Sequence, residues 1–305
     1  MNKQAVKVVG ALVATFAAGA VQAAASAAYL PGCTLDSYAI TKAAPAGTTP
    51  QTLPGNLVIN STGCYGVKAM GNNNPASVTV DNNLGYLNDG LLNGEGNLIP
   101  FNYFITQSQL QDLNPNDVGA RDPGWVELGR ITNASALNSA GSATMVADSI
   151  KTSTGTLNLG SILSFTESAA PITSGGSRAG TWTLSLDANI VNVLKNNGLF
   201  QRNNFDQLAF VVKASDKWAV YDFDFTKLPA GMFDLTQPYS LSGTWNLNDF
   251  KNDPTKPDQG LSFLGVWARD PVLSQPTNVP EPGVLALFGA GLLGMAAARR
   301  RRQSK

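Results

Sequence analysis

Residues 208–225 read LAFVVKASDKWAVYDFDF. Two apolar runs, 208–213 and 218–225, stand on either side of the short stretch 214–217, whose residues are Ala-Ser-Asp-Lys. Apolar runs of this length joined by a few turn-forming residues are typical of a β-hairpin. The sequence therefore predicts two antiparallel strands here, connected by a tight turn.

The second run of this hairpin has two different sides. Side chains alternate along a strand, so Tyr221, Phe223 and Phe225 share one side while Asp222 and Asp224 share the other. We expect the aromatic side to lie in a core and the aspartates to lie on a solvated outer face. Two carboxylates about 6–7 Å apart on a strand also have a spacing that glycoside hydrolysis can use. Asp222 and Asp224 are therefore the alternative candidates for a catalytic pair.

The same alternation recurs elsewhere in the chain. Residues 181–186 (TWTLSL) alternate strictly, with Trp182, Leu184 and Leu186 on one side. Other short runs that predict strands are 57–60, 77–80, 125–131, 144–150, 157–165, 243–247 and 261–268.

One helix is predicted at residues 189–199, where Ile190, Val193 and Leu194 can share a face. Many short strands without regular long helices between them argue for an all-β fold and against a parallel α/β sheet. We therefore expect residues 28–270 to form an extracytoplasmic domain, a β-sandwich of jelly-roll type with one short helix.

Charged residues are sparse in this chain. They make up 14% of it, against roughly 25% in typical soluble domains. The formal net charge is zero, but seven of the 21 basic residues lie within residues 1–27 and 279–305. What remains is mildly acidic and gains nothing from counterion release on a polyanion. Nucleic acid is therefore not expected as a partner.

The chain contains no histidine. Ser-His-Asp and Cys-His nucleophiles and His-ligated zinc are therefore excluded. No P-loop, G-x-G-x-x-G, G-x-S-x-G or C-x-x-C motif occurs. We expect no enzymatic activity, no cofactor and no metal site, although carboxylate-pair chemistry needs no histidine and stays open.

Two kinds of side chain offer alternative binding sites. Tryptophans can stack on sugar rings, although in strands they belong more often to a core; the five are Trp125, Trp182, Trp218, Trp245 and Trp267. Loops rich in Asn and Asp can bind calcium, although these residues also favour turns, which is the interpretation we prefer. The two such loops contain Asp81, Asn82, Asn83, Asn88 and Asp89, and Asn246, Asn248, Asp249, Asn252, Asp253 and Asp258.

Cys33 and Cys64 are the two cysteines. In an exported chain the oxidising compartment favours a disulfide between them, which would stabilise the fold by roughly 3 kcal/mol. The alternative is two unpaired buried thiols. Residues 30–33 (Leu-Pro-Gly-Cys) loosely suggest a lipobox, but the proline before the small residue disfavours lipidation of Cys33.

Residues 1–27 predict a signal peptide. Lys3 and Lys7 give a positive start, residues 8–21 are uncharged and apolar, and small residues offer cleavage sites ending at Ala23 and Ala27. The chain is therefore expected to be exported.

The C-terminal end has three consecutive parts. Val279, Pro280, Glu281 and Pro282 are followed by the uncharged stretch 283–298, and then by Arg299, Arg300, Arg301 and Arg302. As a helix the stretch would span about 24 Å, slightly short of a hydrocarbon core of roughly 30 Å. The arginines are expected to stay cytoplasmic and to leave the domain outside. Residues 271–278 are expected to be a linker.

This end resembles the PEP-CTERM sorting domain of exported proteins from exopolysaccharide-producing Gram-negative bacteria. Residues 279–282 match its signature, 283–298 its short hydrophobic helix and 299–302 its basic stop. The resemblance implies an exosortase-type membrane protease as partner, which recognises the motif and removes the tail during surface delivery. It implies a destination for the protein and no activity.

Three further segments, 64–72, 243–245 and 260–263, loosely resemble passenger domains that carry such tails. Several relatives have Ser-His where Ser262 and Phe263 stand, so this likeness implies no shared histidine-based activity.

The sequence thus predicts a non-enzymatic surface or matrix protein. Its precursor is expected to be anchored in the inner membrane by the C-terminal helix and then delivered to the cell surface or extracellular matrix, where it would support exopolysaccharide, biofilm or floc structure. The alternatives are a carbohydrate-binding module, with or without calcium, and a glycan hydrolase that uses Asp222 or Asp224.

Overall fold

The computed structural model describes residues 32–69, 74–76, 78–114, 116–152, 155–171, 178–196, 205–229, 231–234, 236–251 and 260–269. The predicted signal peptide, linker and C-terminal helix lie outside these ranges. Within them the fold is all-β, as predicted: α1 (Ile190–Asn196) is the single α-helix, and the other helical pieces are short 3₁₀ turns. No helix in the described ranges is both long and apolar enough to span a bilayer.

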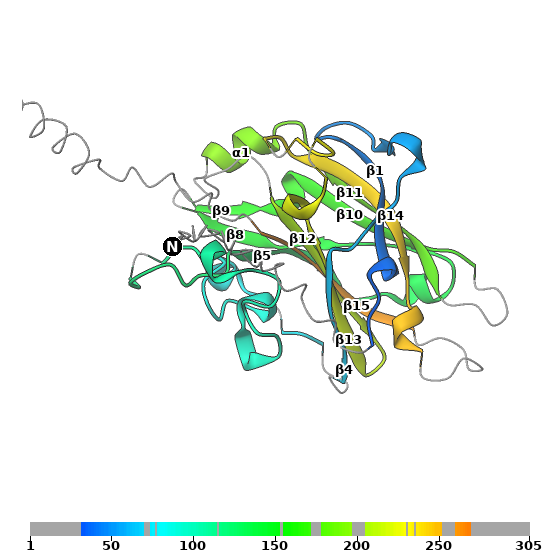
Figure 1. Cartoon of the computed structure of the whole chain (residues 1–305), viewed down its shortest axis with the longest axis horizontal. Helices are drawn as coiled ribbons and strands as arrows, with labels where there is room; N and C mark the ends of the chain where they lie inside the picture. The colour runs from blue at the N-terminus through cyan, green and yellow to red at the C-terminus, as the bar shows by residue number, and fades with distance from the viewer. Residues whose placement is uncertain are drawn as a thin grey trace, which may run out of the picture.

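The first sheet has its strands in the order β2-β1-β14-β11-β10-β6, and β3 also pairs with β1. Its members are β1 (Tyr38–Pro45), β2 (Gln51–Thr52), β3 (Ile59–Asn60), β6 (Ser142–Thr144), β10 (Leu163–Ala169), β11 (Ala179–Leu186) and β14 (Tyr239–Asn246). All pairs are antiparallel. β14 lies between β1 and β11, so strands from the two ends of the domain meet at its centre (Figure 1).

The second sheet has the order β4-β13-β12-β15-β5-β7. Its members are β4 (Gly63–Ala69), β5 (Trp125–Ile131), β7 (Val146–Ala147), β12 (Gln207–Ala214), β13 (Lys217–Asp224) and β15 (Leu261–Arg269). β8 (Ser149–Thr152) and β9 (Gly155–Asn158) form a separate hairpin. The hairpin predicted at 208–225 is confirmed as β12–β13, and its turn places Ser215 at a φ of 55°.

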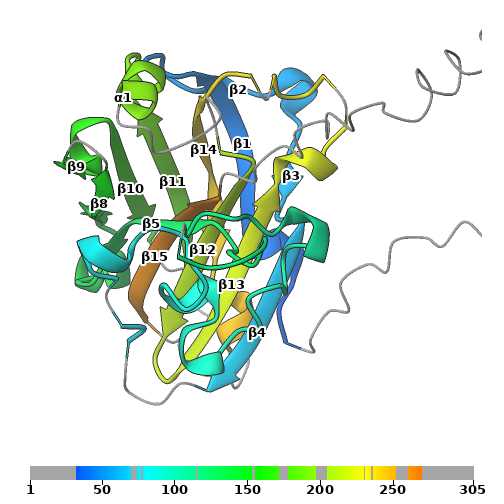
Figure 2. The same ribbon diagram turned by 90° about the vertical axis from the view of Figure 1, so that its left-hand side faces the viewer.

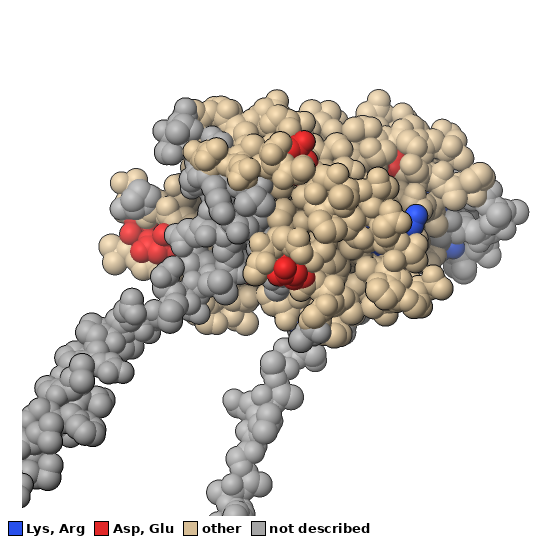
Figure 3. All heavy atoms as spheres, turned by 90° about the horizontal axis from the view of Figure 1, so that it is seen from above, with Lys and Arg blue, Asp and Glu red and all other residues tan. Residues whose placement is uncertain are grey.

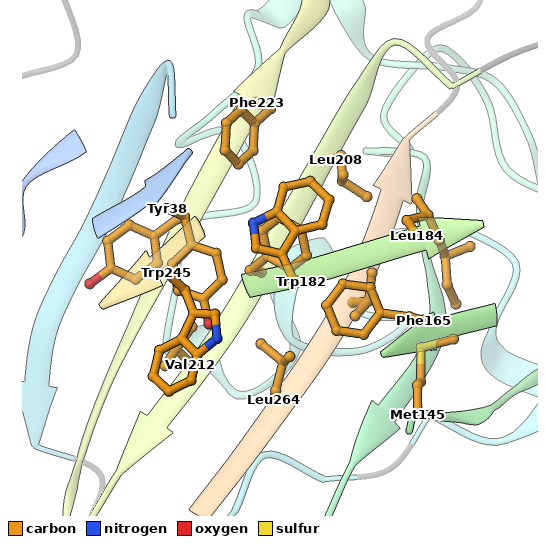
Figure 4. Close-up of a cluster of buried hydrophobic side chains, with 14 of the residues drawn as sticks. Tyr38, Met145, Phe165, Trp182, Leu184, Leu208, Val212, Phe223, Trp245 and Leu264 are labelled. Carbon is orange, nitrogen blue, oxygen red and sulfur yellow. The ribbon is translucent and has the colours of Figure 1, made fainter. Parts of the chain in front are cut away.

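The core lies between the two sheets (Figure 4). Phe210 of β12 is at its centre, with ring centroids 5.0 Å from Tyr38 of β1, 5.0 Å from Trp182 of β11 and 5.7 Å from Phe165 of β10. Each side chain buried in this way contributes about 1.5–3 kcal/mol. The aromatic side predicted for the second hairpin strand is part of this core, since Tyr221 and Phe223 are fully buried.

Two tryptophans of the first sheet each lie opposite a glycine of the neighbouring strand. Trp182 of β11 pairs with Gly243 of β14, and Trp245 of β14 pairs with Gly180 of β11. A Cβ atom on Gly243 would lie 2.7 Å from the Trp182 indole, and one on Gly180 would lie 2.8 Å from the Trp245 indole. The glycines therefore make room for the two indole rings.

A long segment without extended strands covers the outer face of the second sheet. This cover comprises residues 78–114 and 116–124 and lies in front of β12, β13 and β15 in Figure 2. Its apolar side chains form a second core with the outward-facing residues of the sheet; they are Val78, Leu91, Leu92, Ile99, Phe104, Ile105 and Leu110. The second sheet is therefore buried on both faces.

Several predicted strands have different bounds or do not form. Residues 125–131 and 261–268 match β5 and β15 closely, whereas 57–60 shortens to β3. The run 77–80 is not a strand in its described part, because Val80 begins the 3₁₀ turn η3 (Val80–Asn82). The run 144–150 is divided among β6, β7 and β8.

The remaining differences concern the run 157–165 and the missed elements. The 3₁₀ turn η8 (Leu159–Ser161) interrupts 157–165 between β9 and β10. β1 and β4 were not predicted. Each pairs along most of its length with a strand that follows much later in the chain. The predicted helix 189–199 begins one residue later, as α1, and its last residues lie outside the described ranges.

Candidate functional site: an apolar pocket between the two sheets

A pocket opens at one end of the space between the sheets. Its lining is almost entirely apolar and consists of Leu128, Leu184, Leu186, Phe205, Leu208, Phe225, Phe233, Gln237, Pro238, Tyr239 and Leu241. Its volume, which includes solvent at the mouth, is about 510 Å³. Its apolar lining and its position between the two sheets make it the candidate ligand site of the described domain.

Both sheets contribute to the inner end of the pocket. Leu128 of β5 and Leu208 of β12 come from the second sheet, and Leu184 of β11 comes from the first; all three are buried. One wall is aromatic, because the Phe233 ring lies 5.4 Å from that of Phe225 and 5.1 Å from that of Tyr239, in edge-to-face contacts. A ligand in the pocket would thus contact leucine side chains at the inner end and aromatic rings on one side.

Polar groups occur at the rim of the pocket. The Tyr239 hydroxyl accepts hydrogen bonds from the Asp234 backbone N–H at 2.9 Å and from Gln237 Nε2 at 3.2 Å. Gln237 Nε2 also lies 3.3 Å from Asp234 Oδ2. Hydrogen bonds from Thr236 hold the pKa of Asp234 below its usual value, so this carboxylate is charged at neutral pH. The rim therefore combines a phenol hydroxyl with a negative charge.

The last described strand ends next to this pocket. Arg269, at the end of β15, pairs with Gln207 of β12, and its carbonyl accepts a hydrogen bond from the Asp206 N–H. Phe205 and Leu208, on either side of these two residues, line the pocket. The Arg269 side chain is fixed by bonds to two backbone carbonyls of the cover. The last described residue therefore lies at the pocket end of the second sheet.

The prediction that Asp222 and Asp224 lie on a solvated face is wrong. Both are about 1% exposed, because the cover lies over that face of the second sheet. Asp224 accepts hydrogen bonds from the Thr226 N–H and hydroxyl, and its other oxygen lies 3.0 Å from Lys227 Nζ. It thus caps the 3₁₀ turn η9 (Phe225–Lys227).

Asp222 has a different environment from Asp224. Burial, and secondarily the neighbouring Asp224 charge, raise the pKa of Asp222 well above its usual value. Its backbone carbonyl accepts from both the N–H and the hydroxyl of Thr62. Neither aspartate lines the pocket. The pair is integrated into the fold and is almost wholly covered.

The five tryptophans are all buried and belong to the two cores, so none forms an exposed sugar platform. Trp182 and Trp245 also donate their indole N–H groups to backbone carbonyls, at 3.3 Å and 3.2 Å. The interpretation of strand tryptophans as core residues is confirmed.

The acidic loop after β14 holds the start of the domain in place. Asp249 accepts hydrogen bonds from the Thr34 N–H, the Ser37 hydroxyl and the Tyr221 hydroxyl, at 2.7–3.0 Å. Asn246 bonds to the Asp36 carbonyl through its Nδ2. Asn252, Asp253 and Asp258 lie outside the described residues.

The second Asn/Asp loop supports β5. The Asn83 amide bonds to both the N–H and the C=O of Glu127, each at 2.8 Å, and Asn93 does the same at Trp125, at 3.1 Å and 2.7 Å. The two side chains thereby take the place of a neighbouring strand along part of this edge.

The acidic residues of the second loop stabilise its turns. Asp89 accepts from two backbone N–H groups, and Asp81 forms an ion pair with Lys151 at 2.8 Å. Asn82 closes a capping box with Thr79, and Asn88 has a φ of 73°. No group of three acidic, cysteine or histidine side chains that could hold a metal occurs among the described residues.

The sequence analysis missed four buried carboxyl groups, Asp122, Glu127, Glu167 and Asp206, and two of them have a strongly raised pKa. Burial raises the pKa of Glu127 to about 8 against the opposing effect of its ion pair with Arg130. Burial likewise raises the pKa of Glu167, on β10, to about 8; its Oε1 accepts a hydrogen bond from Tyr38 at 3.0 Å. The strand pattern could have identified Glu167, which is in phase with the core residue Phe165. Glu127 lies on the same side of β5 as Trp125, under the cover, so its burial depends on a distant segment.

The predicted disulfide is present. Cys33 and Cys64 are bonded, with their Cα atoms 6.3 Å apart, and they join the segment before β1 to β4.

Charged side chains are sparse on the face shown in Figure 3. Those visible there are scattered and do not form a basic or acidic patch.

The predicted sorting residues, Val279 to Pro282 and Arg299 to Arg302, lie outside the described residues. A family model described as the PEP-CTERM protein-sorting motif matches residues 278–302. Neither the curated proteins nor the solved structures gave a match to the chain.

Proposed function

We propose that this chain, which carries a PEP-CTERM protein-sorting motif at residues 278–302, is an exported exosortase substrate that serves as a non-enzymatic protein of the cell surface or extracellular matrix. The motif is the observation that carries the proposal. Its proline-glutamate-proline signature, uncharged stretch and arginine block supply the recognition, membrane and stop elements of a sorting signal.

The described domain supports export of the chain. Its two cysteines form a disulfide, and disulfides persist mainly in oxidising compartments outside the cytoplasm. In the order we propose, the precursor is held in the inner membrane by residues 283–298, the protease then cleaves near the motif, and the domain moves to the surface or the matrix.

We favour a structural role over the two alternatives, a carbohydrate-binding module and a glycan hydrolase. The tryptophans that a sugar platform would need are buried, and the described carboxylates of the two candidate calcium loops are engaged in hydrogen bonds or an ion pair within the fold. Asp222 and Asp224, the residues that a hydrolase would need, are covered. We therefore propose that the domain contributes to exopolysaccharide or biofilm structure as a stable, folded component.

We further infer that the fold class is a β-sandwich. Two antiparallel sheets share one core, and rings from β1, β10 and β11 pack on Phe210 of the facing sheet. Sheets packed face to face with interdigitating side chains are the defining arrangement of that class.

The sorting step is tested in the bacterium that makes the protein. We expect deletion of residues 280–302 to release the domain from the cells, because the membrane segment is gone. Glu281→Ala should instead accumulate as an uncleaved precursor in the membrane fraction. The linker variant Pro276→Ala is the matched control and should be sorted normally. Fractionation with intact-mass analysis reads out both location and cleavage.

Unchanged location and mass in both test variants would show that the motif does not sort this chain. The structural role is tested separately in a strain that lacks the protein, by measuring the exopolysaccharide retained on cells and the mass of biofilm. If neither changes, the matrix role is wrong, while the sorting result still stands.

A further inference from the structure

The apolar pocket between the sheets requires an explanation that a purely structural role does not give. Protein interiors are close-packed, with few voids larger than a water molecule. Here Leu184, Leu186 and Leu241 of the first sheet and Leu208 of the second, all buried, line an opening between the two sheets. An apolar opening of this kind is typical of a ligand site.

The lining restricts the class of ligand. A sugar or a peptide would leave its hydroxyl or amide groups against leucine and phenylalanine side chains, and each buried polar group without a partner costs about 1–3 kcal/mol. An alkyl chain has no such groups and contributes about 0.8 kcal/mol for each methylene buried. The leucine side chains at the inner end and the aromatic wall therefore select a hydrocarbon chain.

The rim restricts the head group of the ligand. The Tyr239 hydroxyl already accepts two hydrogen bonds, from the Asp234 N–H and Gln237 Nε2, so its own proton can be donated to an oxygen of the ligand. The ionised Asp234 carboxylate at the same rim opposes a negatively charged head. An uncharged head with an accepting oxygen, such as an ester, satisfies both conditions.

The position of the last described residue indicates where such a molecule would come from. Arg269 ends β15 beside the pocket, and the uncharged stretch begins at residue 283. The intervening residues span at most about 50 Å when fully extended. If residues 283–298 lie in a bilayer, as the proposed function requires, the pocket is held within that distance of membrane lipid, which raises the local concentration of acyl chains.

We propose that this pocket binds the acyl chain of an uncharged, single-chain membrane amphiphile, with the Tyr239 hydroxyl donating a hydrogen bond to its head group. The pocket itself stands on the described residues; only the supply of ligand from the membrane rests on the proposed function.

The test uses the full chain reconstituted in phosphatidylcholine vesicles. The probe is a monoacylglycerol with a ten- to twelve-carbon chain and a photoreactive diazirine at its end, and labelled residues are mapped by mass spectrometry. We expect labels on pocket residues such as Leu208 and Phe233. The corresponding free fatty acid, whose head is anionic, should label these residues less.

Three variants separate pocket binding from general contact with lipid. Leu186→Trp places a larger side chain in the pocket and should lower labelling at least about tenfold, since the alkyl chain loses its place. Tyr239→Phe removes one hydrogen bond and should lower labelling about 2- to 10-fold. Tyr65→Phe is the matched control: its hydroxyl bonds to the Leu98 carbonyl at the cover, and its removal should change nothing. Thermal melting by circular dichroism checks that each variant is folded.

Labels confined to other regions of the chain, or pocket labelling that neither Tyr239→Phe nor Leu186→Trp reduces, would overturn the proposal. If Leu186→Trp fails to fold, the comparison of the monoacylglycerol with the fatty acid and the Tyr239→Phe variant still decide it. Vesicle labelling does not depend on sorting in the cell, so its failure is distinguishable from failure of the proposed function.

Discussion

Glu167 lies in the core between the sheets with no exposed surface, and its Oε1 accepts a hydrogen bond from Tyr38. Burial raises its pKa to about 8, from an ordinary value of 4.5. The folded protein therefore holds a proton here, over a pH range in which the unfolded chain has released it. Glu167 thus makes the stability of the whole domain depend on pH.

The sign of that dependence follows from the raised pKa. The stabilisation is complete below about pH 4.5 and is lost as the pH rises through about 8. Within that window the free energy of unfolding falls by about 1.4 kcal/mol per pH unit from this group. Glu167→Gln keeps the shape and the accepting oxygen but does not titrate, so we expect a flatter pH profile between pH 5 and 8, measured by urea unfolding.

The control for this prediction is Glu95→Gln, at an exposed glutamate of the cover. It should leave the pH profile of the wild-type protein unchanged. If Glu167→Gln retains the full slope between pH 5 and 8, the carboxyl group is not neutral in the folded state.

Single residues also show where sequence reasoning stopped. The alternation of Tyr221 and Phe223 with Asp222 identified the side that faces the core, because that side depends only on strand geometry. The same alternation predicted solvent around Asp222, and this was wrong. The side of β13 that carries Asp222 is buried by the cover, which is distant in the sequence. The residues of the strand itself give no sign that the cover folds over them.

At the scale of elements, β5 has an unusual edge. Asn83 and Asn93 satisfy the backbone groups of Glu127 and Trp125 where a further strand would otherwise pair. Unpaired edges invite association with other chains. Two amide side chains from the cover therefore both protect the edge and fix the cover to the sheet.

We expect Asn93→Ala to lower the free energy of unfolding by about 2–4 kcal/mol, because it leaves the buried N–H and C=O of Trp125 without these partners. Asn93→Asp should also destabilise, since it replaces the donating amide with an oxygen that faces a carbonyl. Asn116→Ala, at an exposed asparagine of the same cover, is the control and should change stability by less than about 0.5 kcal/mol. Equal stability of Asn93→Ala and Asn116→Ala in urea would contradict the interpretation.

The elements that were predicted correctly are those whose signals are local. The β12–β13 hairpin has its turn within the sequence, and β5 is one continuous run of residues that stays in one sheet. The run 77–80 was wrong because Thr79 and Asn82 bond to each other and bend the chain into a 3₁₀ turn. The run 144–150 was wrong because the chain passes from the first sheet to the second and on to the β8–β9 hairpin within those residues.

At the scale of the whole molecule, the second sheet is held together by its most C-terminal strand. β15 pairs with β12 on one side and β5 on the other, and its side chains enter both cores. Removing it would divide the sheet and open its two cores to water.

Two truncations test this dependence. A chain that stops after Arg269 keeps all described strands and is expected to unfold cooperatively in urea. A chain that stops after Gly260 lacks β15 and is expected to be unfolded, as seen by loss of near-ultraviolet circular dichroism from the buried tryptophans. A cooperative transition in the shorter chain would show that β15 is dispensable.

The candidate site could be predicted from sequence only in part. The sorting motif is one continuous stretch, so its residue types and order were sufficient to identify it. The pocket is assembled from residues between Leu128 and Leu241 that meet only because distant strands pair in two sheets. No local pattern marks those side chains as neighbours.

The long-range bonds of the N-terminal segment also set an order of events for a chain that crosses a membrane with its N-terminus leading. Cys33 and Cys64, 31 positions apart, emerge early and can be oxidised at once. Ser37 must wait for Asp249, 212 positions later, and β1 must wait for β14. Until then the leading loop is closed covalently, and β1 has only the two-residue strands β2 and β3 as partners. During N-terminus-first export, as we propose it, the long edge of β1 that later pairs with β14 would therefore stay open until almost the whole domain has crossed the membrane.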